Sequence, residues 1–168
     1  DIRSGLESLV VAGKGRPGRV GVVGLSYGGY SAWCAITKAA DLVRAAVPIC
    51  GMYQLTEDYE ATGMPHGRAY SEEMMGGTPA EQPERYFNAS PANFIGRIRG
   101  DLLIVHGLKD SNVSPANTRA ARRDLDRAGI PYQLLTFDNE GHGIYRAGNR
   151  EELFRRSAEF LLKSFNGR

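Results

Sequence analysis

The sequence predicts an α/β domain in which helices flank a parallel sheet. Four short apolar runs alternate with longer stretches in which apolar residues recur at helical spacing. Continuous apolar runs of this length are typical of strands that are buried on both faces of a sheet. Strands that alternate with helices imply parallel pairing with right-handed crossovers. The expected strands comprise residues 19–24, 45–50, 102–106 and 132–137.

The first half of the chain contains two expected helices and an insertion. A helix is expected over residues 2–12, where apolar side chains recur at helical spacing, and the turn-rich residues 13–18 follow it. A second helix is expected from the end of the first strand to about residue 40. Residues 51–92 are rich in Tyr, Met, Gly and Pro, which predicts an irregular insertion with short helices.

Three further helices are expected in the second half. One lies near residues 93–98, before the third strand. Ser114 and Pro115 supply an N-cap and a first helical residue for the next, which Gly129 ends. A helix over residues 150–165 closes the chain.

Length and composition limit the function classes. The 168 residues suit one domain, and 42% apolar with 24% charged residues is ordinary for a globular protein. The net charge of +2 and the interleaved acids of 122–127 predict solvated helix faces rather than nucleic-acid binding. We expect no membrane contact, because no apolar run approaches the roughly 18 residues of a spanning helix. No cleavable secretory segment is expected at the start, and the compartment stays open, with the cytoplasm as the default.

A glycine-flanked serine lies where the first strand turns into a helix. Gly24-Leu25-Ser26-Tyr27-Gly28 follows the strand 19–24 directly. A nucleophilic serine in a G-x-S-x-G motif occupies a strained corner at this kind of turn, so that its hydroxyl is exposed. We expect that a side chain at either flanking glycine would collide with the neighbouring strand or helix.

An acid and a histidine follow in the order that such a serine requires. Asp110 comes after the strand 102–106, and His142 comes after the strand 132–137. Both are expected on loops at the carboxyl edge of the sheet, where open α/β sheets bind their ligands. A serine hydroxyl needs a base to remove its proton, and the base needs a group that orients it. Ser26, His142 and Asp110 are therefore the predicted catalytic triad.

Other residues could compete for these roles. His106 ends the third strand, where a partly buried structural imidazole is the better interpretation, and His66 is expected on the surface of the insertion. Asp138 is only four residues from His142 and is interpreted as a turn former. Cys34 and Cys50 show no metal-ligand spacing and are expected to be reduced, so neither a metal nor an organic cofactor is predicted.

The chain resembles the α/β-hydrolase fold, and within it the catalytic domain of the prolyl oligopeptidase family of serine peptidases. The resemblance covers nearly the whole chain and is carried by five segments. These are residues 24–30, 70–76, 83–91, 106–113 and 140–143. It implies Ser26 as nucleophile, His142 as general base and then acid, and Asp110 as the residue that orients His142.

The resemblance also implies binding roles for three residues. The backbone N–H of Tyr27 would be one oxyanion donor. Tyr70 matches a tyrosine that walls the pocket for the residue before the scissile bond, and Asn112 matches an asparagine that holds a substrate carbonyl. Plain packing of the insertion is the alternative for Tyr70, and a turn is the alternative for Asn112.

Residues 1–168 look like a single but partial domain, the C-terminal half of the fold. A complete domain has eight strands, and the four found here resemble the last four. The loop with the second oxyanion donor and any propeller would lie upstream. The expected partners are therefore the upstream half of the same protein, or a second copy through the edge of the strand 19–24.

Three functions stay open at this point. The first is a prolyl-oligopeptidase-type serine peptidase that cleaves short peptides. The second is a carboxylesterase on small acyl esters, because the triad does not distinguish an ester from an amide. The third is a non-catalytic piece that assembles with the upstream portion.

Overall fold

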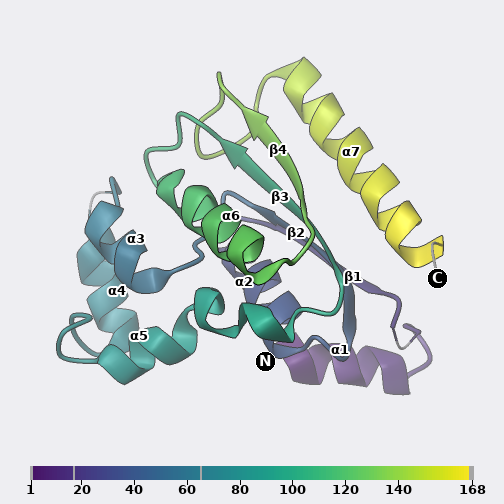
Figure 1. Cartoon of the computed structure of the whole chain (residues 1–168), viewed down its shortest axis with the longest axis horizontal. Coiled ribbons are helices and arrows are strands. Elements are labelled where there is room, and N and C mark those ends of the chain that lie inside the picture. The colour runs from purple at the N-terminus through teal and green to yellow at the C-terminus, as the bar shows by residue number, and fades with distance from the viewer. Residues whose placement is uncertain (1, 17, 65, 167–168) are drawn as a thin grey trace.

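The computed structural model describes residues 2–16, 18–64 and 66–166, and its centre is a parallel sheet of four strands. The strands pair in the order β1-β2-β3-β4, so the order in space is the order along the chain (Figure 1). All three pairings are parallel, as predicted. The observed bounds are Val20–Leu25 for β1, Val43–Ile49 for β2, Asp101–Gly107 for β3 and Gln133–Phe137 for β4.

Helices cover both faces of the sheet. Figure 1 shows α7 (Ala147–Asn166) on one side, with α6 (Ala116–Ala128) on the other. Alternate residues of β2 and β3 point into two separate cores. One core joins Ala46 and Leu102 to the helix α2 (Tyr27–Lys38) and to α6. The other joins Ala45 and Leu103 to α7. This alternation follows from the period of two along a strand and gives the predicted layered α/β domain.

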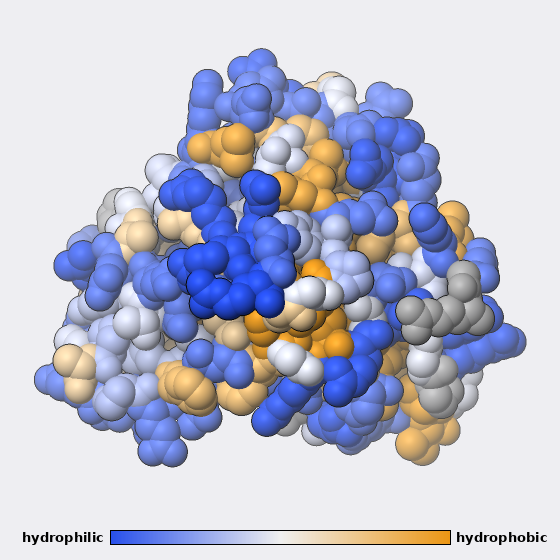
Figure 2. Space-filling model, viewed as in Figure 1, coloured by the Kyte–Doolittle hydropathy of each residue, from blue (hydrophilic) through white to orange (hydrophobic). Residues whose placement is uncertain are grey.

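The helix boundaries follow the expected signals with small shifts. The helix α1 spans Ile2–Val11, and α7 begins three residues before the expected start. The helix α6 begins one residue later than expected, because Pro115 is its N-cap and Ala116 its first residue. The Ser114 hydroxyl still accepts the N–H of Ala116 at 3.2 Å. Gly129 ends this helix with a φ of 66°. The outer face of α6 is charged and exposed, which Figure 2 shows as a hydrophilic cover.

The insertion between β2 and β3 is more helical than irregular. It holds three short helices, which Figure 1 shows on the side of the molecule away from α7. The segment expected as a helix over 93–98 is a 3-10 helix instead. The bounds are Leu55–Ala61 for α3, Gly67–Met75 for α4, Pro83–Ala89 for α5 and Pro91–Arg97 for η1.

The strand β1 lies at one edge of the sheet, and one of its faces is uncovered. Val23 and Leu25 are 49% and 45% exposed, whereas β2 and β3 are buried on both faces. No helix among the described residues is long and apolar enough to cross a membrane. Among the described residues, the bare face of β1 thus leaves apolar side chains exposed, and its outer edge leaves backbone N–H and C=O groups without a partner strand.

Candidate active site

Ser26 stands at a strained corner between β1 and α2. Its φ of 60° and ψ of −119° lie outside the regions that a residue with a side chain prefers. The corner is held by the end of β2, because the N–H of Ser26 donates to the carbonyl of Ile49 at 2.9 Å. Such strain persists only where the surrounding structure enforces it, and here it points the hydroxyl out of the turn.

The expectation about the two flanking glycines is right for one and wrong for the other. A Cβ on Gly24 would lie 2.3 Å from the carbonyl oxygen of Gly28, so only glycine fits there. A Cβ on Gly28 would meet no described atom within 4 Å. The tight position is the next one, because a Cβ on Gly29 would lie 2.5 Å from the carbonyl oxygen of Ile49. The close approach of α2 to β2 therefore requires the glycine just after the pentapeptide.

Asp110 lies on the loop after β3 and is 6% exposed. Its Oδ1 accepts the backbone N–H groups of Asn112 at 2.9 Å and of Val113 at 3.0 Å. Burial alone would raise the pKa of Asp110, but these bonds and contacts from His106 and His142 outweigh it and hold the pKa below its ordinary value. The carboxyl group is therefore ionised near neutral pH and fixed in direction.

His142 joins the acid to the serine. Its Nδ1 lies 2.9 Å from Oδ2 of Asp110, and its Nε2 lies 2.7 Å from Oγ of Ser26. Because an ionised carboxylate only accepts hydrogen bonds, Nδ1 carries the proton and Nε2 is free to accept from the serine hydroxyl. The structure thus brings together the three residues that the sequence proposed, from three loops at the carboxyl edge of the sheet.

The competing residues do not take the place of His142 or Asp110 beside Ser26. Asp138 is exposed in the turn after β4, as expected of a turn former, and His66 is exposed ahead of α4. His106 is fully buried, which agrees with its interpretation as a structural imidazole.

Glu140 is a supporting residue to which the sequence analysis assigned no role. Its carboxylate is 4% exposed and accepts the backbone N–H groups of Tyr145 and Arg146 and the side-chain amide of Asn149. Its carbonyl oxygen accepts the N–H of Lys109 at 2.8 Å. Glu140 therefore ties the histidine loop to the acid loop and to the start of α7. The sequence offered one signal for this role, which is an acidic residue two positions before the histidine and shortly before a helix.

Comparison with known proteins decides the family. The model of the prolyl oligopeptidase family matches residues 1–168. The chain belongs to the prolyl oligopeptidase family. This membership agrees with the fold and with the order of the three residues along the chain.

Several relatives of this prolyl oligopeptidase family member are peptidases by name. Dipeptidyl peptidase 8 of Homo sapiens is 34% identical over 129 residues, which cover 75% of this chain and 13% of that protein. Dipeptidyl aminopeptidase BIII of Pseudoxanthomonas mexicana is 26% identical over 172 residues, which cover 100% of this chain and 25% of that protein. The chain therefore spans about a quarter or less of the relatives that it matches.

A solved structure of a peptidase has the same fold as this chain. A puromycin-hydrolyzing peptidase of Mycobacterium tuberculosis superposes with a TM-score of 0.90 and 28% identity, over 97% of this chain and 24% of that one. The four-stranded sheet is thus part of an α/β-hydrolase peptidase fold.

Tyr27 is the residue whose N–H is predicted to be an oxyanion donor. It is the first residue of α2, and the N–H groups of a helix's first turn have no acceptor within the helix. The N–H of Tyr27 immediately follows the nucleophile, so the oxygen of an attacked carbonyl can lie against it. The ring of Tyr27 is half exposed beside the same cavity.

A cavity of about 210 Å³ opens beside Ser26 and His142. Tyr70 and Asn112, the two predicted substrate-binding residues, both line it. All four methionines of the chain also line this cavity, which was not predicted from the sequence. They reach the cavity from β2's end and from the insertion, and they are Met52, Met64, Met74 and Met75. The lining also includes one buried carboxyl group, that of Asp58.

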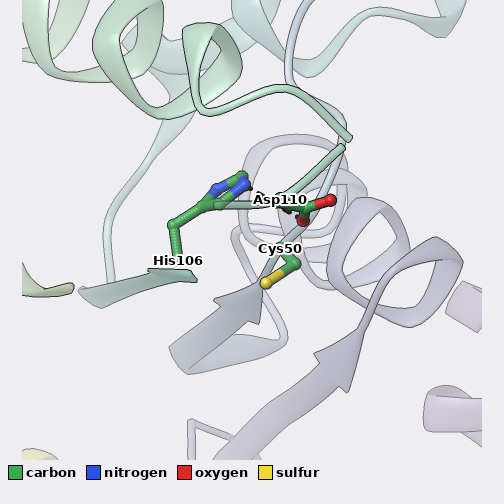
Figure 3. A group of neighbouring side chains, drawn as sticks. All are labelled: Cys50, His106 and Asp110. Carbon is green, nitrogen blue, oxygen red and sulfur yellow. Dashed lines mark ion pairs between the residues drawn. The ribbon is translucent and has the colours of Figure 1, made fainter. Parts of the chain in front are cut away.

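Asp110, the predicted acid of the triad, forms a compact buried group with Cys50 and His106 (Figure 3). One potential ligand atom of each lies within 4.8 Å of the others. Both ring nitrogens of His106 already have partners, Thr118 Oγ1 at 2.7 Å and the Val113 carbonyl at 3.0 Å. Burial raises the pKa of Cys50 to about 12, so its thiol keeps its proton. Because a metal needs free lone pairs on its ligands, this group is better suited to support Asp110 than to bind an ion.

Proposed function

We propose that this chain is the catalytic part of a serine peptidase that cleaves short peptides through an acyl-enzyme on Ser26. The observation that carries the proposal is the continuous hydrogen-bonded line from Ser26 through His142 to Asp110, with distances of 2.7 and 2.9 Å. A line of this kind at a strained serine is the arrangement that activates a hydroxyl as a nucleophile.

The first half of the reaction forms the acyl-enzyme. His142 Nε2 takes the hydroxyl proton of Ser26 while Oγ forms a bond to the carbonyl carbon of the substrate. The carbonyl oxygen becomes negative and accepts the N–H of Tyr27. Asp110 stabilises the positive imidazole that results. His142 then gives the same proton to the leaving nitrogen, and the C–N bond breaks.

The second half restores the enzyme. Water gives a proton to His142 Nε2 while its oxygen bonds to the acyl carbon. The bond between this carbon and Oγ then breaks, and His142 returns the proton to Ser26. The balance is one peptide bond and one water converted to a carboxylic acid and an amine, without any cofactor.

The cavity suggests which residue precedes the scissile bond. Its walls are mostly aromatic side chains and methionines, so it suits a large apolar side chain. Methionine is flexible and polarisable, and a wall with four of them can adapt to several shapes. We assign Tyr70 to this wall, and Asn112 to a carbonyl of the bound peptide.

A carboxylesterase is the second candidate, because nothing in the triad or the serine corner separates an ester from an amide. Comparing an aminoacyl-anilide with a short-chain nitrophenyl ester distinguishes the two. A peptidase hydrolyses the anilide with a kcat/KM that depends on the side chain next to the scissile bond. An enzyme that acts on the nitrophenyl ester alone would support the esterase.

We further propose that the bare edge of β1 is covered by a partner, which is either upstream chain of the same protein or a second copy. The observations are that β1 is the outermost strand of the sheet among the described residues, and that Val23 and Leu25 on this strand stay about half exposed. Expressing residues 1–168 alone and measuring the mass in solution tests this. A soluble monomer of undiminished activity would contradict both forms of the proposal. An inactive chain that regains activity with the upstream segment would favour assembly.

The nucleophile is tested with a fluorophosphonate probe. We expect the probe to label Ser26, and Ser26→Ala to abolish both labelling and hydrolysis. Ser31→Ala is the matched control, since Ser31 lies on the same helix and its hydroxyl donates to the carbonyl of Tyr27 at 2.9 Å. Labelling of Ser26→Ala at the original rate would show that the assignment is wrong.

A further inference from the structure

His106 is a second imidazole in contact with the acid of the triad. It ends β3, four residues before Asp110, and it is fully buried. Its Nε2 lies 3.3 Å from Oδ2 of Asp110, a contact that the dashed line in Figure 3 marks. Oδ2 is also the oxygen closest to His142. Asp110 therefore lies between two imidazole rings, one next to the serine and one inside the core.

The partners of His106 determine its protonation. Nε2 faces the carbonyl oxygen of Val113 at 3.0 Å and the carboxylate of Asp110, and both groups only accept hydrogen bonds. Nε2 therefore carries a hydrogen. Nδ1 lies 2.7 Å from the hydroxyl of Thr118, which can donate to it. One neutral tautomer satisfies all three neighbours, so the ring needs no positive charge in the core.

We propose that His106 is a positioning residue for catalysis, which holds Asp110 in place and shares its negative charge through the Nε2–H group. The inference rests on the proposed function of the triad. Oδ1 of Asp110 is fixed by the two backbone N–H groups of Asn112 and Val113. Oδ2 lies 2.9 Å from Nδ1 of His142 and 3.3 Å from Nε2 of His106, and the Cys50 thiol also contacts this carboxyl group. Because His142 moves protons during the reaction whereas His106 keeps its hydrogen, the Nε2–H edge of His106, 3.3 Å from Oδ2, is the electropositive contact that stays constant.

The groups packed around His106 exclude water from its Nε2–H group. Cys50 approaches from the end of β2, Thr118 from α6, and Asp58 from α3. Burial raises the pKa of Asp58, and its Oδ1 accepts the side-chain amide of Asn117 at 2.7 Å. With Asp110, these are the titratable and polar groups that face the ring. A hydrogen bond in such a site is stronger than one exposed to water.

Two substitutions of His106 separate positioning from packing. His106→Leu fills the space and removes the donor, whereas His106→Gln returns an N–H near the place of Nε2. We expect His106→Leu to lower kcat by about 10- to 100-fold, which is less than the roughly 10⁴-fold loss typical when the orienting acid itself is inactivated. KM stays within about two-fold, because the ring does not touch the cavity. His106→Gln recovers most of the lost kcat.

A pH profile adds a readout that packing does not move. Without the donor from His106, the negative charge of Asp110 acts more fully on the ring of His142 and favours its protonated form. The pH at which kcat/KM reaches half its plateau is therefore higher in His106→Leu than in the original protein and in His106→Gln. Equal kcat values in His106→Leu and the original protein, or equal losses in the Leu and Gln variants, would overturn the inference.

Thr118 supplies an independent test if His106→Leu does not fold. Thr118→Val removes the hydroxyl that orients the ring at nearly constant volume, and Thr118→Ser keeps it. Thr37→Val is the control, since Thr37 is equally buried and bonds only to its own helix. Of these three variants, only Thr118→Val should have a severalfold lower kcat than the original protein. Equal kcat values in Thr118→Val and Thr118→Ser would overturn the inference.

All variants are measured in the natural full-length protein beside Ser26→Ala. Activity that survives Ser26→Ala refutes the proposed function and with it this inference. Loss of activity in Ser26→Ala together with normal kcat in the His106 and Thr118 variants refutes only the inference.

Discussion

Replacing Asp110 with asparagine should reverse the hydrogen bond between this residue and Nδ1 of His142. The structure determines how the new amide group is oriented. The backbone N–H groups of Asn112 and Val113 both point at Oδ1 of Asp110. In Asp110→Asn the amide oxygen takes this place, because an NH₂ group would face two donors. The NH₂ group then occupies the Oδ2 position, 2.9 Å from Nδ1 of His142. Nδ1 also lies 3.1 Å from the Oδ1 position, but the NH₂ group is closer. When the NH₂ group donates to Nδ1, the hydrogen of the ring moves onto Nε2, which can then no longer accept from Ser26.

The magnitude follows from the alternative that the variant must adopt to react. Turning the amide over restores the acceptor for His142 but leaves two buried N–H groups facing an NH₂ group. At about 1–3 kcal/mol for each unsatisfied donor, this costs about 2–6 kcal/mol. At about 1.4 kcal/mol per factor of ten, the rate falls by about 30-fold to 2 × 10⁴-fold. Loss of the carboxylate charge places the expected fall near the upper end, at about 10⁴-fold in kcat.

The assay is hydrolysis of an aminoacyl-anilide in the full-length protein, with the rate of fluorophosphonate labelling measured in parallel. Both are expected to fall together, because both require the proton transfer from Ser26. Asp138→Asn is the matched control, since Asp138 lies exposed in the turn after β4. An Asp110→Asn enzyme within about ten-fold of the original rate would refute this chain of reasoning. Loss of activity in Asp138→Asn would move the orienting acid to Asp138.

Two further predictions follow from the packing around Gly24 and from the burial of the cysteine thiols. Gly24→Ala is expected to lower the free energy of unfolding by about 1–3 kcal/mol or more and to reduce activity, because its Cβ would lie 2.3 Å from a backbone oxygen. Denaturant unfolding checks this, with Gly28→Ala as the variant whose stability should not fall. Burial raises the pKa of Cys50 to about 12, and it also raises the pKa of Cys34 above its usual value. Because the thiolate is the reactive form, iodoacetamide should alkylate Cys50 only after unfolding. Mass spectrometry of the treated protein checks this.

Much of the site could be predicted because it depends on residue types at strand ends. The serine corner needs a glycine before it and a strand on one side with a helix on the other, and all of this is local in sequence. Asp110 and His142 could be placed because parallel strands carry their following loops to the same edge. What local reasoning misjudged was Gly28. The tight contact is made by Gly29 against the end of β2, about twenty residues further on, and such a contact has no local signal.

The sequence by itself predicted the fold class, the four parallel strands and the three residues that the structure brings into hydrogen-bond distance, because short-range patterns of hydrophobicity and turn residues govern them. Only the tertiary structure decided what surrounds these residues. Four methionines that lie up to 23 positions apart meet in one cavity, because the insertion folds its helices over the carboxyl edge of the sheet. His106 faces Asp110 because Val113 and Thr118, further along the chain, hold its ring in place. These contacts depend on how whole elements pack, and packing is a property of three dimensions that spacing along the chain does not encode.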